Sequence, residues 1–285
     1  MTASGTFGYG TEYASLLDVN ELGAIVTKAI SRQPRDGNPP PRTVETPSGM
    51  LNAIGWQNIG LNACLREYAP TWGRWNVPVI VNVAGFSIEE YAEVAEALAS
   101  APGVAAIELN ISCPNVEGLP FALRPELAAE VTAAVRAVCD VPLICKLSPN
   151  VTDVVEIAAA VVAAGADAVS LINTLVGMVI DTRTRRPVLG NRTGGLSGPA
   201  VRPVAVRMVY EVHRALPDVP IIGAGGVMTT DDALQFIFAG ARAVQVGTAN
   251  FVNPRASVEI VAGLRDYLER EGVRDMSELV GAAHR

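Results

Sequence analysis

The sequence predicts an α/β fold of the (β/α)8 barrel type, built by residues 1–285 as a single domain. Short, continuous apolar runs alternate with amphipathic segments through the middle and the end of the chain. Eight such runs favour a closed barrel over an open doubly wound sheet. An open sheet that binds a dinucleotide should also carry G-x-G-x-x-G after an early strand, and the sequence has no such segment.

The predicted strands are largely continuous apolar runs rather than alternating ones, which suits strands of a parallel sheet that are buried on both faces. In chain order, the strands are Thr2–Ser4, Ala24–Thr27, Val79–Val83, Ala105–Ile111, Leu143–Leu147, Ala168–Ile172, Pro220–Gly223 and Ala243–Gly247. Segments with helical periodicity lie between and after them. These predicted helices are Ile88–Ser100, Pro125–Val138, Asp153–Ala164, Pro203–Leu216, Asp231–Ala239 and Arg255–Glu271.

Two segments interrupt this alternation. Ser31–Gly49 is rich in Pro, Arg, Asn and Gly and is predicted to be a long loop. Val176–Pro199 is predicted to form a hairpin, Met178–Leu189, followed by a glycine-rich turn. Both segments follow strands, so both are expected at the C-terminal face, where barrel enzymes build their active sites.

Composition excludes several classes of protein. A net charge of −7 disfavours a nucleic-acid partner. No run of about 18 apolar residues is present, so we expect a cytoplasmic protein without a membrane anchor. None of the four cysteines forms a C-x-x-C pair, and the two histidines, His213 and His284, stand outside the strand ends. We therefore expect no metal site and no histidine base.

Polar residues recur where the predicted strands end. They are Ser4, Lys28, Asn82, Asn110, Lys146, Asn173, Thr174 and Thr248. The amides among them both donate and accept hydrogen bonds, which suits a planar heterocycle better than a bare anion. Lys28 and Lys146 are the only lysines beside twenty arginines, so either chance or a need for a compact point charge has kept them there.

Two further features indicate chemistry at this face. The glycines in Gly225-Gly226 and Gly247-Thr248 follow the last two strands, where barrels commonly bind a phosphate through backbone N–H groups, although the first pair could also be a simple tight turn. Cys113 lies in a polar loop beyond the fourth strand and is the candidate base or nucleophile. Glu108 is the one acidic alternative at a strand end, and its direction cannot be read from the sequence.

At these positions the chain resembles the class 1 dihydroorotate dehydrogenases, and most closely their NAD-linked class 1B branch. The resemblance covers almost the whole length of the chain. It rests on the segments Thr2–Gly8, Met50–Gly55, Val81–Gly85, Leu109–Val116, Lys146–Asp153, Ile172–Leu175, Gly194–Pro199, Gly225-Gly226 and Gly247–Asn250.

The resemblance implies an FMN-dependent enzyme that oxidises (S)-dihydroorotate to orotate in pyrimidine biosynthesis. Cys113 would remove the C5 proton while the hydride passes from C6 to N5 of FMN. The implied FMN contacts are Ser4, Lys28, Ala29, Asn82, Asn110, Lys146, Ile172, Gly198, Gly225, Gly226, Gly247 and Thr248. The implied substrate contacts are Lys28, Asn52, Ala53, Ile54, Gly55, Trp56, Asn110, Asn115, Asn173 and Thr174.

The same resemblance implies a homodimer within a heterotetramer, whose second subunit would carry FAD and a [2Fe–2S] cluster and pass electrons to NAD⁺. Three features depart from the family pattern. The sequence lacks the hairpin that usually precedes the first strand, the segment after Val116 is altered, and Trp56 stands where leucine is usual. Alternatives to this function are a dihydropyrimidine dehydrogenase-like flavoprotein, a dihydrouridine synthase, which the net charge disfavours, and a non-catalytic FMN-binding scaffold.

Overall fold

The computed structural model describes residues 1–111 and 123–285. Its centre is a seven-stranded parallel sheet in which each strand pairs with the next one added along the chain. The strands in this order are β1 (Ile25–Val26), β4 (Val79–Val83), β5 (Val104–Leu109), β6 (Leu143–Lys146), β7 (Ala168–Leu171), β12 (Ile221–Ala224) and β13 (Ala243–Gln245).

The N-terminal residues join the two edges of this sheet. Thr2 forms a parallel bridge with Val246, just beyond β13. On its other side, the N–H of Thr2 donates to the carbonyl of Ala24 at 3.3 Å, and its hydroxyl accepts from the N–H of Val26 at 3.0 Å. The sheet therefore closes on itself, as predicted. The predicted strand Thr2–Ser4 is shorter than expected, since only the bridge at Thr2 remains of it.

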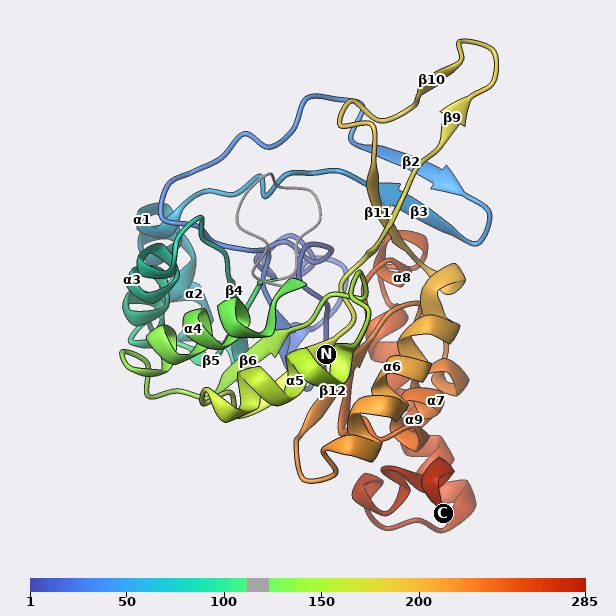
Figure 1. The fold of residues 1–285 in the computed structure, drawn as a ribbon. Helices are drawn as coiled ribbons and strands as arrows, with labels where there is room; N and C mark the ends of the chain where they lie inside the picture. The colour runs from blue at the N-terminus through green and yellow to red at the C-terminus, as the bar shows by residue number, and fades with distance from the viewer. Residues whose placement is uncertain (112–122) are drawn as a thin grey trace.

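Helices surround the barrel (Figure 1), and all six predicted helices are confirmed with shifts of a few residues at their ends. They are α3 (Ile88–Ala99), α4 (Pro125–Arg136), α5 (Val154–Ala163), α6 (Arg202–Ala215), α7 (Thr230–Phe238) and α9 (Ala256–Glu271). Side-chain caps fix three of the starting points. Ser87 caps α3, Asp153 caps α5, and Thr229 forms a capping box with Asp232 at α7.

Shorter helical segments complete the chain. A helical stretch that was not predicted consists of α1 (Leu61–Ala63), a π-helical part (Cys64–Tyr68) and α2 (Ala69–Trp72). The helix α8 (Ala249–Val252) follows β13, and single 3₁₀ turns occur at Val19–Glu21, Pro199–Val201, Met276–Leu279 and Ala282–His284. Within the described ranges, no helix is long and apolar enough to cross a bilayer.

A second sheet at the C-terminal ends of the barrel strands corrects two predictions. Its four antiparallel strands, in spatial order, are β2 (Thr43–Thr46), β3 (Gly49–Asn52), β11 (Gly194–Ser197) and β8 (Leu175–Gly177). The end of the predicted loop Ser31–Gly49 is thus a strand, and so is the predicted glycine-rich turn. Glycine is needed in β11 because a Cβ on Gly195 would clash with the Thr174 hydroxyl at 1.9 Å.

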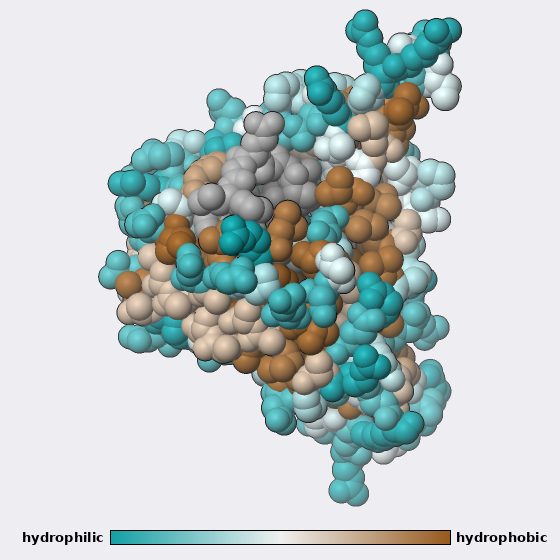
Figure 2. All heavy atoms as spheres, in the orientation of Figure 1, coloured by the Kyte–Doolittle hydropathy of each residue, from teal (hydrophilic) through white to brown (hydrophobic). Residues whose placement is uncertain are grey.

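The predicted hairpin Met178–Leu189 is confirmed as β9 (Ile180–Asp181) and β10 (Arg186–Pro187), which project away from the barrel (Figure 1). Val176, Met178 and Ile180, on or next to β8 and β9, are about half exposed. Hydrophobic side chains also gather below the projecting hairpin on the face shown in Figure 2. Apolar patches of this kind are typical of protein–protein contact surfaces.

Side chains inside the barrel form two layers of different character. The lower layer is apolar and consists of Ala24, Val26, Ile80, Ala106, Ile144 and Ile222, with Ala168 and Ala243 packed against them. Two residues further along the strands, the inward positions are polar: Asn82, Glu108, Lys146, Ser170 and Gln245. Residues between these positions, such as Val81 and Ile107, pack outward in the main hydrophobic cluster with the helices.

Candidate functional site

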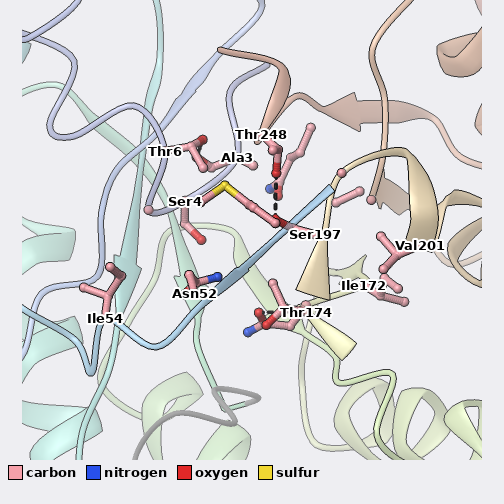
Figure 3. A pocket seen from close by; sticks show the side chains of 18 of the residues that line it. Ala3, Ser4, Thr6, Asn52, Ile54, Ile172, Thr174, Ser197, Val201 and Thr248 are labelled. Atoms are coloured by element: carbon pink, nitrogen blue, oxygen red, sulfur yellow. Dashed lines mark hydrogen bonds between the residues drawn. The ribbon is translucent and has the colours of Figure 1, made fainter. Parts of the chain in front are cut away.

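A cavity of about 300 Å³ lies at the C-terminal ends of the barrel strands, under the antiparallel sheet (Figure 3). All of the predicted site residues that the structure describes, except Ala53, line this cavity. They are Ser4, Lys28, Ala29, Asn52, Ile54, Gly55, Trp56, Asn82, Asn110, Lys146, Ile172, Asn173, Thr174, Gly198, Gly225, Gly226, Gly247 and Thr248. Ala53 is buried next to the cavity, while Cys113 and Asn115 lie outside the described residues.

Glycines from the ends of two neighbouring strands line one part of the cavity. The β12 and β13 strands pair at Ala224 and Gln245, so the glycines that follow each strand are neighbours. Among the described residues, no acceptor takes the N–H groups of Gly226, Gly247 or Thr248. The Thr248 hydroxyl donates to that of Ser197 at 2.8 Å (Figure 3). These donors, near the start of a helix, could hold a phosphate.

The loop that carries Gly226 is held in place by contacts with Arg202 and Asp232. Arg202 donates to the carbonyl of Gly226 at 3.2 Å and forms an ion pair with Asp232 at 2.6 Å. Asp232 in turn accepts from the N–H groups of Met228 and Thr229. The acidic residue that caps α7 therefore also fixes the position of the glycine turn.

Side-chain amides line the part of the cavity nearest the centre of the barrel. The Asn110 amide donates to Asn82 at 3.2 Å and accepts from Asn173 at 3.4 Å. The carbonyl of Asn110 accepts from the buried Tyr91 hydroxyl at 2.7 Å. These bonds fix the orientation of amides at the ends of three strands, and all three side chains line the cavity.

The two lysines enter the same cavity but have different surroundings. Lys146 is 5 % exposed, and its ammonium donates to the Ser4 hydroxyl at 3.1 Å and to the Gln245 amide oxygen at 3.5 Å. The Lys28 side chain makes no hydrogen bond or ion pair within the described part of the chain. Burial lowers the pKa of Lys28, while nearby Glu12 opposes that shift and Arg42 adds to it.

The antiparallel sheet forms the wall of the cavity opposite the barrel. The Asn52 amide on β3 donates to the carbonyl of Gly195 on β11 at 3.3 Å. After β3, the backbone takes positive φ at both Gly55 and Trp56, and both residues face the cavity. Positive φ at a tryptophan is rare and marks a backbone held by its surroundings. β3, the residues that follow it and the predicted glycine-rich turn, which is β11, thus supply this wall.

The cysteines of the described residues are unsuited to catalysis. Cys64, Cys139 and Cys145 are buried free thiols. Burial raises the pKa of both Cys64 and Cys145 to about 12, which suppresses the reactive thiolate. Within the described ranges, no group of three or more His, Cys, Asp or Glu residues could hold a metal ion.

Sequence reasoning missed several lining residues, among them Thr6, Met50, Ser197, Gln245 and Phe251. Gln245 carried a detectable signal, because it is a polar residue inside an otherwise apolar strand. Ser197 carried none, since its segment was interpreted as a glycine-rich turn, and no element was predicted at Met50. The direction of Glu108, which the sequence left undecided, is inward, and its side chain is completely buried below the cavity.

Comparison with known proteins assigns the family. The family profile described as dihydroorotate dehydrogenase matches residues 1–268. The chain belongs to the dihydroorotate dehydrogenase family. It is 57% identical, over all of its length and 93% of the relative's, to the catalytic subunit of dihydroorotate dehydrogenase B (NAD⁺) from Desulforudis audaxviator. It is 58% identical to the protein of the same name from Geotalea daltonii, covering 99% of this chain and 93% of that one.

Membership of the dihydroorotate dehydrogenase family identifies the chain as an oxidoreductase and confirms the resemblance stated from the sequence. A crystal structure of DHODH from Eimeria tenella, in complex with ferulenol, superposes with a TM-score of 0.79 at 21% identity, covering 93% of this chain and 80% of that one. This likeness supports the barrel fold independently of the sequence relatives.

Proposed function

We propose that this chain is the FMN-binding catalytic subunit of an NAD-linked dihydroorotate dehydrogenase and oxidises (S)-dihydroorotate to orotate in pyrimidine biosynthesis. One observation carries the proposal. A single cavity combines free backbone N–H groups at one end with amides and two lysines at the other, in a chain nearly 60% identical to catalytic subunits of that name.

The donors in the cavity fit FMN. Its phosphate would lie on Gly225, Gly226, Gly247 and Thr248, where a Cβ at Gly226 would lie 2.7 Å from the carbonyl oxygen of Gly198 and crowd the turn. The flavin ring would contact Ser4, Lys28, Ala29, Asn82, Asn110, Lys146, Ile172 and Gly198. When bound, the flavin supplies the acceptor for the substrate hydride.

Dihydroorotate carries a carboxylate and a ring with amide-like edges. Lys28 offers an ammonium group without a partner among the described residues, and Asn52, Asn110, Asn173 and Thr174 offer hydrogen bonds to the ring. Ile54, Gly55 and Trp56 close the side of the cavity, and Ala53 supports them from behind. The roles of Cys113 as base and Asn115 as a substrate contact rest on the sequence motif alone.

Turnover requires an exit for the electrons. The relatives are named catalytic subunits of an NAD⁺ enzyme, which indicates that a second subunit exists for them. For this chain we propose a cytoplasmic homodimer bound to a subunit with FAD and a [2Fe–2S] cluster. The exposed apolar residues beside β8 and β9 offer contact area for another chain.

Anaerobic mixing tests the proposal. The FMN-loaded chain should lose its flavin absorbance on addition of dihydroorotate and should keep it on addition of dihydrouracil, which lacks the carboxylate. Bleaching by dihydrouracil instead would favour a dihydropyrimidine dehydrogenase-like activity, and no bleaching by either compound would favour a scaffold. The lone chain should reduce dyes but not NAD⁺, and it should gain NAD⁺ reduction when the second subunit is added.

A further inference from the structure

A connected group of polar side chains lies inside the barrel, directly below the proposed flavin site. Five different strands contribute one residue each: Asn82 (β4), Glu108 (β5), Lys146 (β6), Ser170 (β7) and Gln245 (β13). All five are at most 5 % exposed. Asn82, Lys146 and Gln245 also line the cavity, whereas Glu108 and Ser170 do not.

Glu108 is the centre of this group. One of its carboxylate oxygens accepts from the Asn82 amide at 2.7 Å and lies 3.9 Å from the Lys146 ammonium. The other oxygen accepts from the Ser170 hydroxyl at 2.8 Å and from the Gln245 amide at 2.7 Å. Every partner donates, which is the arrangement that suits an ionised, acceptor-only carboxylate.

The same contacts determine what the cavity presents to a ligand. Because the Gln245 amide nitrogen is bound by Glu108, its oxygen is turned toward Lys146 and accepts from it at 3.5 Å. Because the Asn82 nitrogen is also bound by Glu108, the Asn82 oxygen is left to accept from Asn110. Glu108 therefore fixes the orientation of both amides without reaching the cavity itself.

We propose that Glu108 is a positioning residue that also sets the electrostatic potential at the flavin. The proposal rests on the FMN function given above. A negative charge on Glu108, whose carboxylate oxygen lies 3.9 Å from the Lys146 ammonium inside the barrel, would cancel part of the positive charge that Lys146 directs at the bound cofactor. Glu108 thereby makes the flavin harder to reduce than Lys146 alone would, and so easier to reoxidise.

The test is the redox equilibrium of the FMN-loaded full chain against a dye of known potential. Glu108→Gln keeps the size of the side chain and removes its charge. The ratio of reduced to oxidised flavin should rise at least tenfold at a fixed dye ratio, which equals about 30 mV for a two-electron couple. Ser170→Ala is the matched control, since it removes a donor from the same cluster without changing charge, and its ratio should stay within about threefold of wild type.

A purely structural role would predict weaker FMN binding in both variants and, for the FMN that stays bound, an unchanged ratio of reduced to oxidised flavin. If Glu108→Gln fails to fold because Lys146 is left without its counter-ion, Lys146→Met is compared with the double variant Glu108→Gln/Lys146→Met. The double variant should be the more easily reduced of the two. Equal ratios in both comparisons would overturn the proposal. Failure of the wild type to bind FMN would overturn this inference and the proposed function, whereas FMN binding without bleaching by dihydroorotate would overturn only the proposed function.

Discussion

Replacing Gly226 by alanine tests the phosphate end of the cavity most directly. Gly226 has φ +75, and an added Cβ would lie 2.7 Å from the Gly198 carbonyl oxygen and 2.9 Å from the Arg202 Cβ. The Gly198 oxygen belongs to the backbone and the Arg202 Cβ is attached to it, so neither atom can move away alone and the turn itself must shift. A shift that costs one hydrogen bond to a charged phosphate is worth about 1.5–3 kcal/mol. The dissociation constant for FMN should therefore rise roughly tenfold to hundredfold.

The assay is titration of the flavin-free chain with FMN, followed by quenching of flavin fluorescence. Gly272→Ala is the control, since Gly272 also has positive φ, +66, but lies at the end of α9 with nothing within 4 Å of the added Cβ. Gly272→Ala should lower the free energy of unfolding by about 1 kcal/mol and leave the dissociation constant for FMN unchanged. Unchanged FMN affinity in Gly226→Ala, or an equal loss in both variants, would refute the assignment.

Three other outcomes follow from the site. Cys113→Ala should retain FMN, but its flavin should be reduced by dihydroorotate roughly 10²–10⁴-fold more slowly in stopped-flow absorbance. Cys64→Ala, which removes a buried thiol, should leave the reduction rate unchanged. Normal reduction in Cys113→Ala would exclude Cys113 as the base. Lys146→Arg should lower the flavin content of the purified chain, because a guanidinium is too wide for this position, where the side chain is 5 % exposed and donates to Ser4. A flavin content equal to that of the wild type would show that only the charge matters at this position. Since burial lowers the pKa of Lys28, its ammonium is lost at a lower pH than in free lysine, so orotate affinity should fall as pH rises through that lowered pKa, and Lys28→Met should abolish this dependence.

The barrel could be predicted from the sequence because its strands are buried on both faces and therefore stand out as apolar runs. Val79–Val83 was predicted with its observed bounds, and Leu143–Leu147 ends one residue beyond β6. The antiparallel sheet could not be predicted in the same way. Its strands at Thr43–Thr46 and Gly194–Ser197 are short, polar or glycine-rich, and they are held by their partner strands rather than by a hydrophobic pattern.

The lining of the cavity was largely predictable because parallel strands bring their C-terminal ends to one rim, so that polar residues at Asn82, Asn110 and Lys146 had to meet. The inward direction of Glu108 was not predictable. In a strand without a solvent-exposed face, the alternation of side chains leaves no polar side to compare with. Only the register of the neighbouring strands places Glu108 next to Asn82 and below the cavity.

The closure of the barrel at Thr2 ties the cofactor site to the integrity of the sheet. Thr2 is the seam between the first and the last parallel strands, and the residues that follow it at once, Ala3, Ser4 and Thr6, line the cavity. A ligand that binds those residues therefore also stabilises the pairing of Thr2 with both strands. Its binding free energy is added to the free energy needed to open the barrel. Binding of the cofactor should therefore slow hydrogen exchange most at the amides of Ala3 and Val246. The first donates to the carbonyl of Val246 and the second to the carbonyl of Met1, so both close the barrel.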